Sequence, residues 1–219
     1  MNRVFKKRSF LTTVVALLLV VCLTGCFSSD FDAKRYTQGC LDALTKAKFD
    51  DYTEMTTITK EEAQKQYDEH MDKELASLTG AVSLSADLQE QYLALFKDLY
   101  SKCKYEVGEA VKNSDESYTV SVTTYKMKAF EGTMESVMKK IEKLAKESKN
   151  ISQDEVTEKT FQFLLDEVKG KLENVEYAEA QKIDISVTCN NSTNTYTISE
   201  SDYQKIVQAC IDIDALSNQ

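Results

Sequence analysis

The fold is decided in residues 85–122, SADLQEQYLALFKDLYSKCKYEVGEAVKNSDESYTVSV, where the spacing of the apolar residues changes. Up to Cys103 the apolar residues recur every three or four positions, which predicts an amphipathic helix. Residues 105–111 and 118–122 then alternate between apolar and polar or small side chains. Residues 113–117 between them have turn chemistry, so the pattern predicts a β-hairpin directly after the helix.

On the N-terminal side of this stretch, helical spacing predicts two more helices, over residues 33–48 and 60–78. Asp32 is placed to cap the first helix, and Thr59 with Glu62 forms a capping box for the second. Residues 49–52, Phe-Asp-Asp-Tyr, interrupt the pattern and are expected to turn the chain.

On the C-terminal side, Gly132 ends the hairpin and helical spacing returns over residues 133–145 and 153–172, the latter with a capping box at Ser152 and Glu155. A second hairpin is expected at residues 183–198 and a last helix at 200–210. Apolar residues change parity within the first hairpin, which indicates a bulge or a second covered face near Thr123.

Helices followed by hairpins predict an α+β fold, with the helices packed on an antiparallel sheet made of the two hairpins. We expect a single domain over residues 32–219, with two halves meeting near Gly132 as the alternative. Residues 26–31 would be a short tether ahead of that domain, and residues 1–25 a signal peptide.

The signal peptide is predicted from three features that follow one another in the expected order. Four basic residues and no acidic one precede an apolar run over residues 10–21, and Leu23-Thr24-Gly25-Cys26 follows. The apolar run is shorter than the roughly 20 residues of a spanning helix, which favours an export signal. The motif resembles the end of a bacterial lipoprotein signal, although an ordinary secretory peptide that happens to carry a cysteine is the alternative.

That resemblance implies cleavage between Gly25 and Cys26 and a diacylglyceryl group on the Cys26 thiol, with acyl chains such as palmitate. Two acyl chains hold a protein at a membrane far more firmly than one. We therefore expect a lipid-anchored protein on the extracytoplasmic face of the cell membrane.

The remaining chain is acidic. Arg3, Lys6, Lys7 and Arg8 leave with the signal, so 23 basic and 36 acidic residues remain and the net charge is −13. Such a surface repels phosphate backbones and anionic head groups, which argues against nucleic-acid binding.

Four cysteines, Cys40, Cys103, Cys189 and Cys210, remain after the signal and Cys26 are set aside. An even number outside the cytoplasm predicts up to two disulfides, with three connectivities open. From the order of the elements we predict Cys40–Cys103 and Cys189–Cys210. Buried small side chains are the other interpretation of the same residues.

Catalytic and metal-binding patterns are weak. His70, the single histidine, lies on a charged helix and is expected to face solvent rather than act as a base. The carboxylate pairs are interpreted as solvated faces, at Asp50 and Asp51, Glu61 and Glu62, and Asp212 and Asp214. No zinc or calcium spacing occurs, so neither a metal nor a cofactor is predicted. The eleven tyrosines mostly follow the helix and strand periods, which predicts core packing rather than an aromatic ligand surface.

Three stretches carry a resemblance: residues 36–43 (YTQGCLDA), 104–110 (KYEVGEA) and 196–199 (YTIS). They resemble small, uncharacterised lipoproteins of Gram-positive bacteria, a domain of unknown function, which implies no catalytic residue. A looser likeness, helices followed by a hairpin sheet, is to the nuclear-transport-factor-2-like fold, whose members often bind small molecules.

Together these features predict a membrane-anchored lipoprotein without catalytic activity that binds a small ligand or another envelope protein. Two alternatives remain open from the sequence, a cell-envelope hydrolase that uses carboxylates and a small solute-binding component of a transporter.

Overall fold

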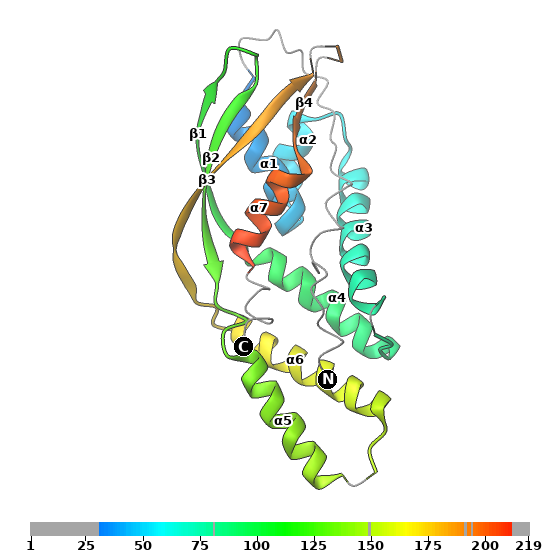
Figure 1. Cartoon of the computed structure of the whole chain (residues 1–219). Helices are drawn as coiled ribbons and strands as arrows, with labels where there is room; N and C mark the ends of the chain where they lie inside the picture. Colours follow the sequence, from blue (N-terminus) through cyan, green and yellow to red (C-terminus); the bar gives the residue numbers. More distant parts are fainter. Residues whose placement is uncertain (1–30, 81, 149, 191, 194, 212–219) are drawn as a thin grey trace.

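The structure is a computed structural model that describes residues 31–80, 82–148, 150–190, 192–193 and 195–211. Within these ranges helices and antiparallel strands form the predicted α+β fold (Figure 1). The elements in chain order are α1 (Ala33–Lys46), α2 (Asp50–Met55), α3 (Lys60–Thr79), α4 (Ala86–Ser101), β1 (Lys104–Lys112), β2 (Tyr118–Met127), α5 (Thr133–Glu147), α6 (Gln153–Leu172), β3 (Tyr177–Asn190), β4 (Thr195–Ile198) and α7 (Glu200–Cys210).

The helices begin where the sequence provides side-chain caps. Asp32 Oδ1 accepts the backbone N–H of Arg35 at 2.9 Å at the start of α1. Capping boxes open α3 at Thr59 and α6 at Ser152, and in each the glutamate three residues later accepts the cap residue's own N–H. These bonds satisfy amides that have no partner inside the helix, so local sequence fixes these starts.

The four strands form one antiparallel sheet in the order β1-β2-β3-β4. β3 is the longest of them and pairs along its first part with β2 and at its end with β4. It begins at Tyr177, six residues before the predicted start at Ile183. The early part of β3 escaped prediction because residues 178–182 are small or polar and show no apolar alternation.

The irregularities of the sheet differ from the bulge expected near Thr123, which pairs regularly with both neighbouring strands. The register shifts instead between Val107 and Ala110 of β1 and between Tyr125 and Met127 of β2. Gly108 lies inside the first shift, where a Cβ would be 3.1 Å from the Ser121 carbonyl oxygen, so the strands approach each other at a residue without a side chain.

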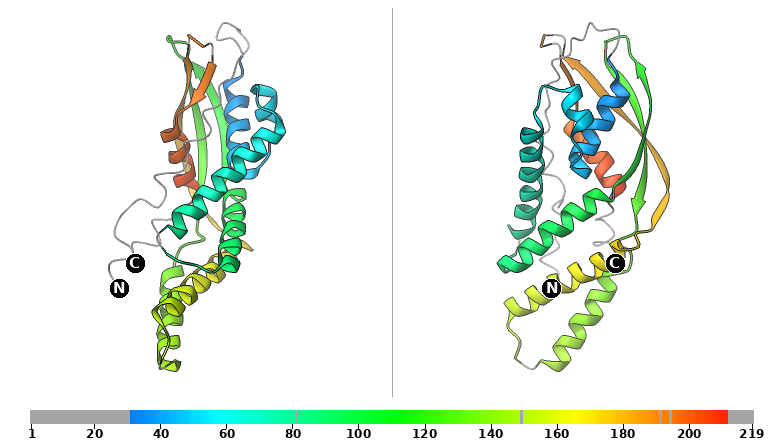
Figure 2. Two further views of the ribbon diagram at one scale, coloured as in Figure 1. Left: turned by 90° about the vertical axis from the view of Figure 1, so that its right-hand side faces the viewer. Right: turned by 180° about the vertical axis from the view of Figure 1, so that it is seen from behind.

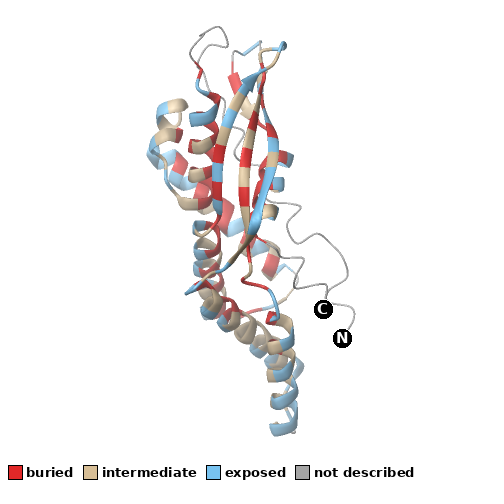
Figure 3. Ribbon diagram, turned by 90° about the vertical axis from the view of Figure 1, so that its left-hand side faces the viewer, coloured by how far each residue is buried: buried red, intermediate tan, exposed pale blue. Residues whose placement is uncertain are grey.

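One face of the sheet is covered by helices. α1 and α7 pack against it side by side, with α2 and α3 outside α1, and none of the described helices covers the opposite face (Figures 1 and 2). Alternate residues of β2 follow this division, since Val120 and Val122 are fully buried whereas Thr119 and Ser121 are partly exposed (Figure 3). Strand alternation therefore separates an apolar inner face from a polar outer face.

A short helix, α2, replaces the turn that residues 49–52 were expected to form. Its Tyr52 is 1% exposed and packs against α1 beside Gly39. A Cβ on Gly39 would lie 2.8 Å from the Tyr52 backbone nitrogen, so the glycine permits the two helices to approach closely. The burial of an aromatic ring stabilises a helix too short to persist on its own.

The α5–α6 hairpin extends beyond the end of the sheet that lies away from the strand turns (Figure 1). It is held to the rest of the molecule through α4, where the Tyr92 hydroxyl donates to the Phe161 carbonyl oxygen at 2.8 Å. The rings of these two residues also meet edge to face, with centroids 5.9 Å apart. The hairpin thus forms the end of the molecule opposite the strand turns.

Candidate functional site

The predicted anchor, Gly25 and Cys26, lies outside the described residues, which begin at Phe31. Phe31 stacks on Tyr196 of β4 with ring centroids 3.6 Å apart, and Tyr118 of β2 lies edge to face with Tyr196 and tilted against Phe31. Tyr36 of α1 closes the cluster and donates its hydroxyl to the Tyr196 carbonyl oxygen at 3.0 Å. The chain therefore enters the domain at the strand-turn end of the sheet, fixed there by aromatic packing.

None of the helices in the described part of the chain combines the length and apolar content that crossing a membrane requires. Covalent geometry limits how far the domain can stand from Cys26. Phe31 lies five residues after Cys26 in the sequence, and a chain extends at most about 3.6 Å per residue, which gives roughly 18 Å.

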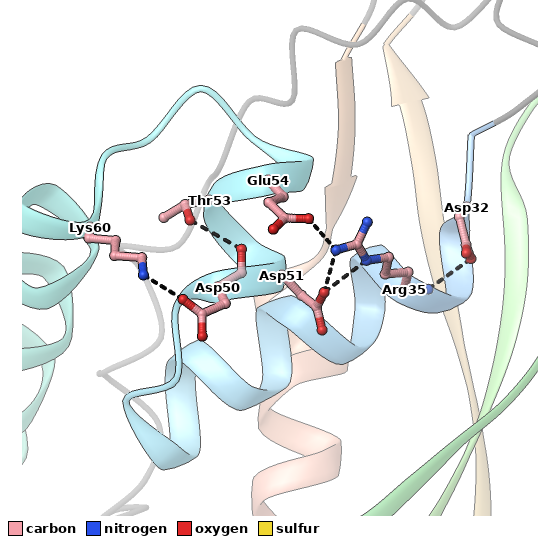
Figure 4. A network of polar contacts seen from close by, with 7 residues as sticks. All are labelled: Asp32, Arg35, Asp50, Asp51, Thr53, Glu54 and Lys60. Atoms are coloured by element: carbon pink, nitrogen blue, oxygen red, sulfur yellow. Dashed lines mark hydrogen bonds and ion pairs between the residues drawn. The ribbon is translucent and has the colours of Figure 1, made fainter.

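A network of ion pairs borders this end (Figure 4). Arg35 of α1 binds Asp51 at 2.7 Å and also pairs with Glu54, both on α2. Asp50 turns the other way and pairs with Lys60 of α3 at 2.5 Å. Hydrogen bonds to Glu54 and Asp51 raise the pKa of Arg35.

The members of this network are largely exposed, in keeping with the solvated interpretation of Asp50 and Asp51. Glu62, from the second predicted carboxylate pair, completes the α3 capping box, whereas Asp212 and Asp214 lie outside the described residues. Exposed pairs of this kind orient helices and contribute little to stability.

His70 does not face solvent as predicted. It is 4% exposed and its ring meets Tyr100 of α4 edge to face, with centroids 5.3 Å apart. One turn further along α3, Glu74 is 7% exposed and accepts the Tyr100 hydroxyl at 2.7 Å. The apolar residues alone did not reveal this face, but Tyr67, His70 and Glu74 share helical spacing and mark the same stripe.

Two helical carboxyls that tyrosine hydroxyls contact, the buried Glu74 and the half-buried Asp42, respond differently to their surroundings. Burial raises the pKa of Glu74, and the hydrogen bond from Tyr100 offsets only part of this. Burial also raises the pKa of Asp42 on α1, but hydrogen bonds from Lys46, Tyr105 and Gln38 outweigh it and the net shift is downward. Asp42 is therefore held as a carboxylate.

The Asp42 site joins α1 to the first strand of the sheet. Its Oδ1 accepts the Tyr105 hydroxyl at 2.6 Å and Lys46 Nζ at 2.8 Å, and the same hydroxyl lies 3.0 Å from Thr45 Oγ1. Lys46 Nζ also lies 4.0 Å from the centre of the Tyr105 ring. These contacts occupy the carboxylate with structural partners, which is the chemistry of a helix-to-sheet joint rather than of a general base.

The four candidate disulfide cysteines are not joined as predicted. In this structure neither Cys103 nor Cys210 is bonded to its predicted partner, so neither Cys40–Cys103 nor Cys189–Cys210 is formed. Cys40 is buried in the middle of α1 and Cys189 is half-buried on β3, whereas the Cys103 thiol meets Cys210. Connectivity depends on which helix ends the sheet brings together, and residue order alone does not contain that information.

The uncovered outer face of the sheet contains an open hollow of about 460 Å³. It is lined by Glu109, Val111, Asn113, Thr119, Ser121, Lys182 and Asp184. The lining combines hydroxyls, an amide, two carboxylates and one amine, so it can exchange hydrogen bonds with a polar partner. No group of three or more histidine, cysteine or acidic side chains suited to a metal ion occurs within the described residues.

No protein-family model matches the chain, and no curated protein matches it. Among solved structures it is similar to the Bacillus subtilis protein YcdA, described as a "putative lipoprotein", with a TM-score of 0.55 and 17% identity. The similarity covers 82% of this chain and 55% of YcdA. At this identity the likeness shows a shared fold, and it agrees at that level with the resemblance to uncharacterised lipoproteins.

Proposed function

We propose that the protein is a lipoprotein anchored through Cys26 to the extracytoplasmic face of the cell membrane, where its domain serves as a non-catalytic binding module. The observation that carries the proposal is the Leu23-Thr24-Gly25-Cys26 motif directly after a basic and apolar leader, five residues ahead of Phe31. The similarity to YcdA supports it through the fold.

The point at which the chain enters the domain sets how the anchored domain would be oriented. Phe31, Tyr118 and Tyr196 tie the entry point to the strand-turn end of the sheet. With a tether of at most about 18 Å, that end stays next to the membrane and the α5–α6 hairpin points away from it. The strands would then run away from the membrane surface, and the outer face of the sheet would be accessible to other molecules of the envelope.

The side chains support binding rather than catalysis. The buried Glu74 and the half-buried Asp42 each accept a hydrogen bond from a tyrosine hydroxyl. An envelope hydrolase that used carboxylates would need two of them facing a substrate across a cleft. The hollow on the outer face does carry two carboxylates, Glu109 and Asp184, but it is an open hollow on a sheet face and not a cleft, so we assign it binding through hydrogen bonds.

The anchor is tested by substitution of the two early cysteines. Cells that express the wild type, Cys26→Ala or Cys22→Ala are fed an alkyne analogue of palmitate and fractionated. Wild type and Cys22→Ala should take up the label and sediment with membranes, because Cys22 belongs to the removed leader. Cys26→Ala should remain unlabelled, and equal labelling of this variant would overturn the anchor.

The binding surface is tested by cross-linking in intact cells. A photoreactive amino acid is placed at Ser121, inside the hollow, and in a control at Lys143 on the exposed side of α5. We expect the Ser121 probe to give a discrete cross-linked product that the Lys143 probe does not give. The same products from both positions, or none from Ser121, would contradict binding at the outer face.

A further inference from the structure

Two buried thiols meet where α4 passes into β1 and α7 ends. Cys103, between Ser101 of α4 and Lys104 of β1, is 3% exposed, and Cys210, the last residue of α7, is 1% exposed. The Cys210 sulfur lies 3.8 Å from the carbonyl oxygen of Lys104, the residue after Cys103. The two thiols also interact directly with each other.

The sheet fixes this meeting. Lys104 pairs with Tyr125 of β2, and Ile211 forms a parallel bridge with Met127, two residues further along the same strand. Cys103 immediately precedes Lys104, and Cys210 immediately precedes Ile211. Both cysteines therefore lie next to the C-terminal end of β2. The backbone N–H of Cys103 donates to the Tyr100 carbonyl oxygen at 3.0 Å, and this bond fixes the turn from α4 into β1.

We infer that Cys103 and Cys210 are a covalent modification site and form a disulfide in the mature protein. The inference rests on the proposed function in one respect, because export supplies the oxidising surroundings in which protein thiols pair. The bond would join the end of α7 to the α4–β1 corner. It corrects the predicted connectivity, since each of these cysteines was assigned a different partner from the sequence.

The oxidant required is a disulfide of another thiol compound or protein. One cysteine thiolate attacks that disulfide, forms a mixed disulfide and releases one thiolate. The second cysteine thiolate then displaces the other thiolate and closes the Cys103–Cys210 bond. Two electrons pass to the external disulfide, and the two protons lost by the cysteines leave on the two released thiols.

The reaction takes place while the chain folds. In the folded protein both sulfurs are buried, and hydrogen bonding to Cys210 together with burial raises the pKa of Cys103 well above its ordinary value. The attacking thiolate is therefore scarce once α7 has docked. A chain that has left the cytoplasm but not yet buried α7 exposes both thiols to the oxidant.

The experiment uses the full-length protein extracted from membranes. It is denatured in the presence of N-ethylmaleimide, which labels free thiols, and digested with a protease that cuts after glutamate. Cys103 then lies in fragment 91–106, Cys210 in fragment 201–219 and Cys189 in fragment 180–200. We expect fragments 91–106 and 201–219 to be linked, unlabelled before reduction and labelled after it. Cys40→Ser should retain this link, and Cys103→Ser should lose it and leave Cys210 labelled.

Stability provides a second readout. Closing a loop of this length should make the melting temperature of the oxidised wild type about 4–16 °C higher than that of the reduced protein. Cys103→Ser should melt at the same temperature with and without reductant, whereas Cys40→Ser should keep the difference.

Two results would overturn the inference. The first is N-ethylmaleimide on Cys103 and on Cys210 before reduction. It would have to be found in the extracted protein and again after the full-length chain has been unfolded and refolded with oxidised glutathione. The other is a link from either cysteine to a different fragment. The mass of the lipid on Cys26, read in the same sample, reports the anchor separately, so a lipidated protein with free thiols refutes the disulfide alone.

Discussion

The substitution Tyr100→Phe removes one hydroxyl from the α3–α4 interface, and its cost should depend on pH because the acceptor is a buried carboxyl. The hydroxyl donates to Glu74 Oε1 at 2.7 Å, and Glu74 is 7% exposed. A hydrogen bond to a charged group contributes roughly 1.5–3 kcal/mol, against roughly 0.5–1.5 kcal/mol for a neutral pair. Tyr100→Phe should therefore lower the free energy of unfolding by about 1.5–3 kcal/mol at pH 8.

The sign of the pH dependence follows from Glu74. Burial raises its pKa in the folded protein above the unfolded value, and the Tyr100 hydrogen bond lowers it part of the way back. The folded state thus binds this proton more tightly, so stability falls as the pH rises from the unfolded pKa, about 4.3, through the folded pKa. Without the hydroxyl the folded pKa rises further. The difference between variant and wild type should be smallest below the unfolded pKa and grow with increasing pH.

Urea unfolding at a series of pH values between about 3.5 and 8.5 measures this difference. Tyr177→Phe is the matched control, because the Tyr177 hydroxyl donates at 2.8 Å to a neutral acceptor, the Lys102 carbonyl oxygen. Its cost should be about 0.5–1.5 kcal/mol at every pH. A Tyr100→Phe cost that does not change with pH, or that never exceeds the control, would refute the role assigned to Glu74.

Three further predictions concern the joints of the fold. Gly39→Ala should lower the free energy of unfolding by about 1–3 kcal/mol because its Cβ would press on the α2 backbone, and a higher melting temperature would contradict this. Gly170→Ala, a helical site with open space around it, should raise the free energy of unfolding by up to about 1 kcal/mol, and a lower melting temperature would contradict that. Tyr105→Phe should raise the pKa of Asp42 in the folded protein. The lowered pKa of Asp42 contributes stability above its unfolded pKa, and this contribution is lost as the pH falls. The loss of stability in the variant should therefore become smaller in acid, and a loss that grew in acid would contradict the role of Asp42. Ser152→Ala should cost about 1 kcal/mol in chemical unfolding, and no measurable cost would show that the α6 cap is dispensable.

The parts of the fold that local sequence determines could be predicted. Ser152 and Thr59 lie where the structure begins α6 and α3, because a capping residue needs only the amides next to it. The alternation around Val120 predicted the buried face of β2 for a similar reason, since strand geometry sends successive side chains to opposite faces.

The parts that depend on distant neighbours could not be predicted. His70 was assigned to solvent because it lies on a charged helix, yet α4 packs against that face of α3 and buries it. The meeting of Cys103 and Cys210 depends on the pairing of Ile211 with Met127, which links segments far apart in the chain. The outer hollow likewise arises only when β1, β2 and β3 lie side by side.

The intact mass of the membrane-extracted protein shows whether a lipid on Cys26 anchors the domain. We expect a chain that has lost residues 1–25, begins at Cys26 and carries the added mass of a diacylglyceryl group. A chain that still begins at Met1 and carries no lipid would contradict the anchor, and with it the membrane orientation inferred from the entry point at Phe31.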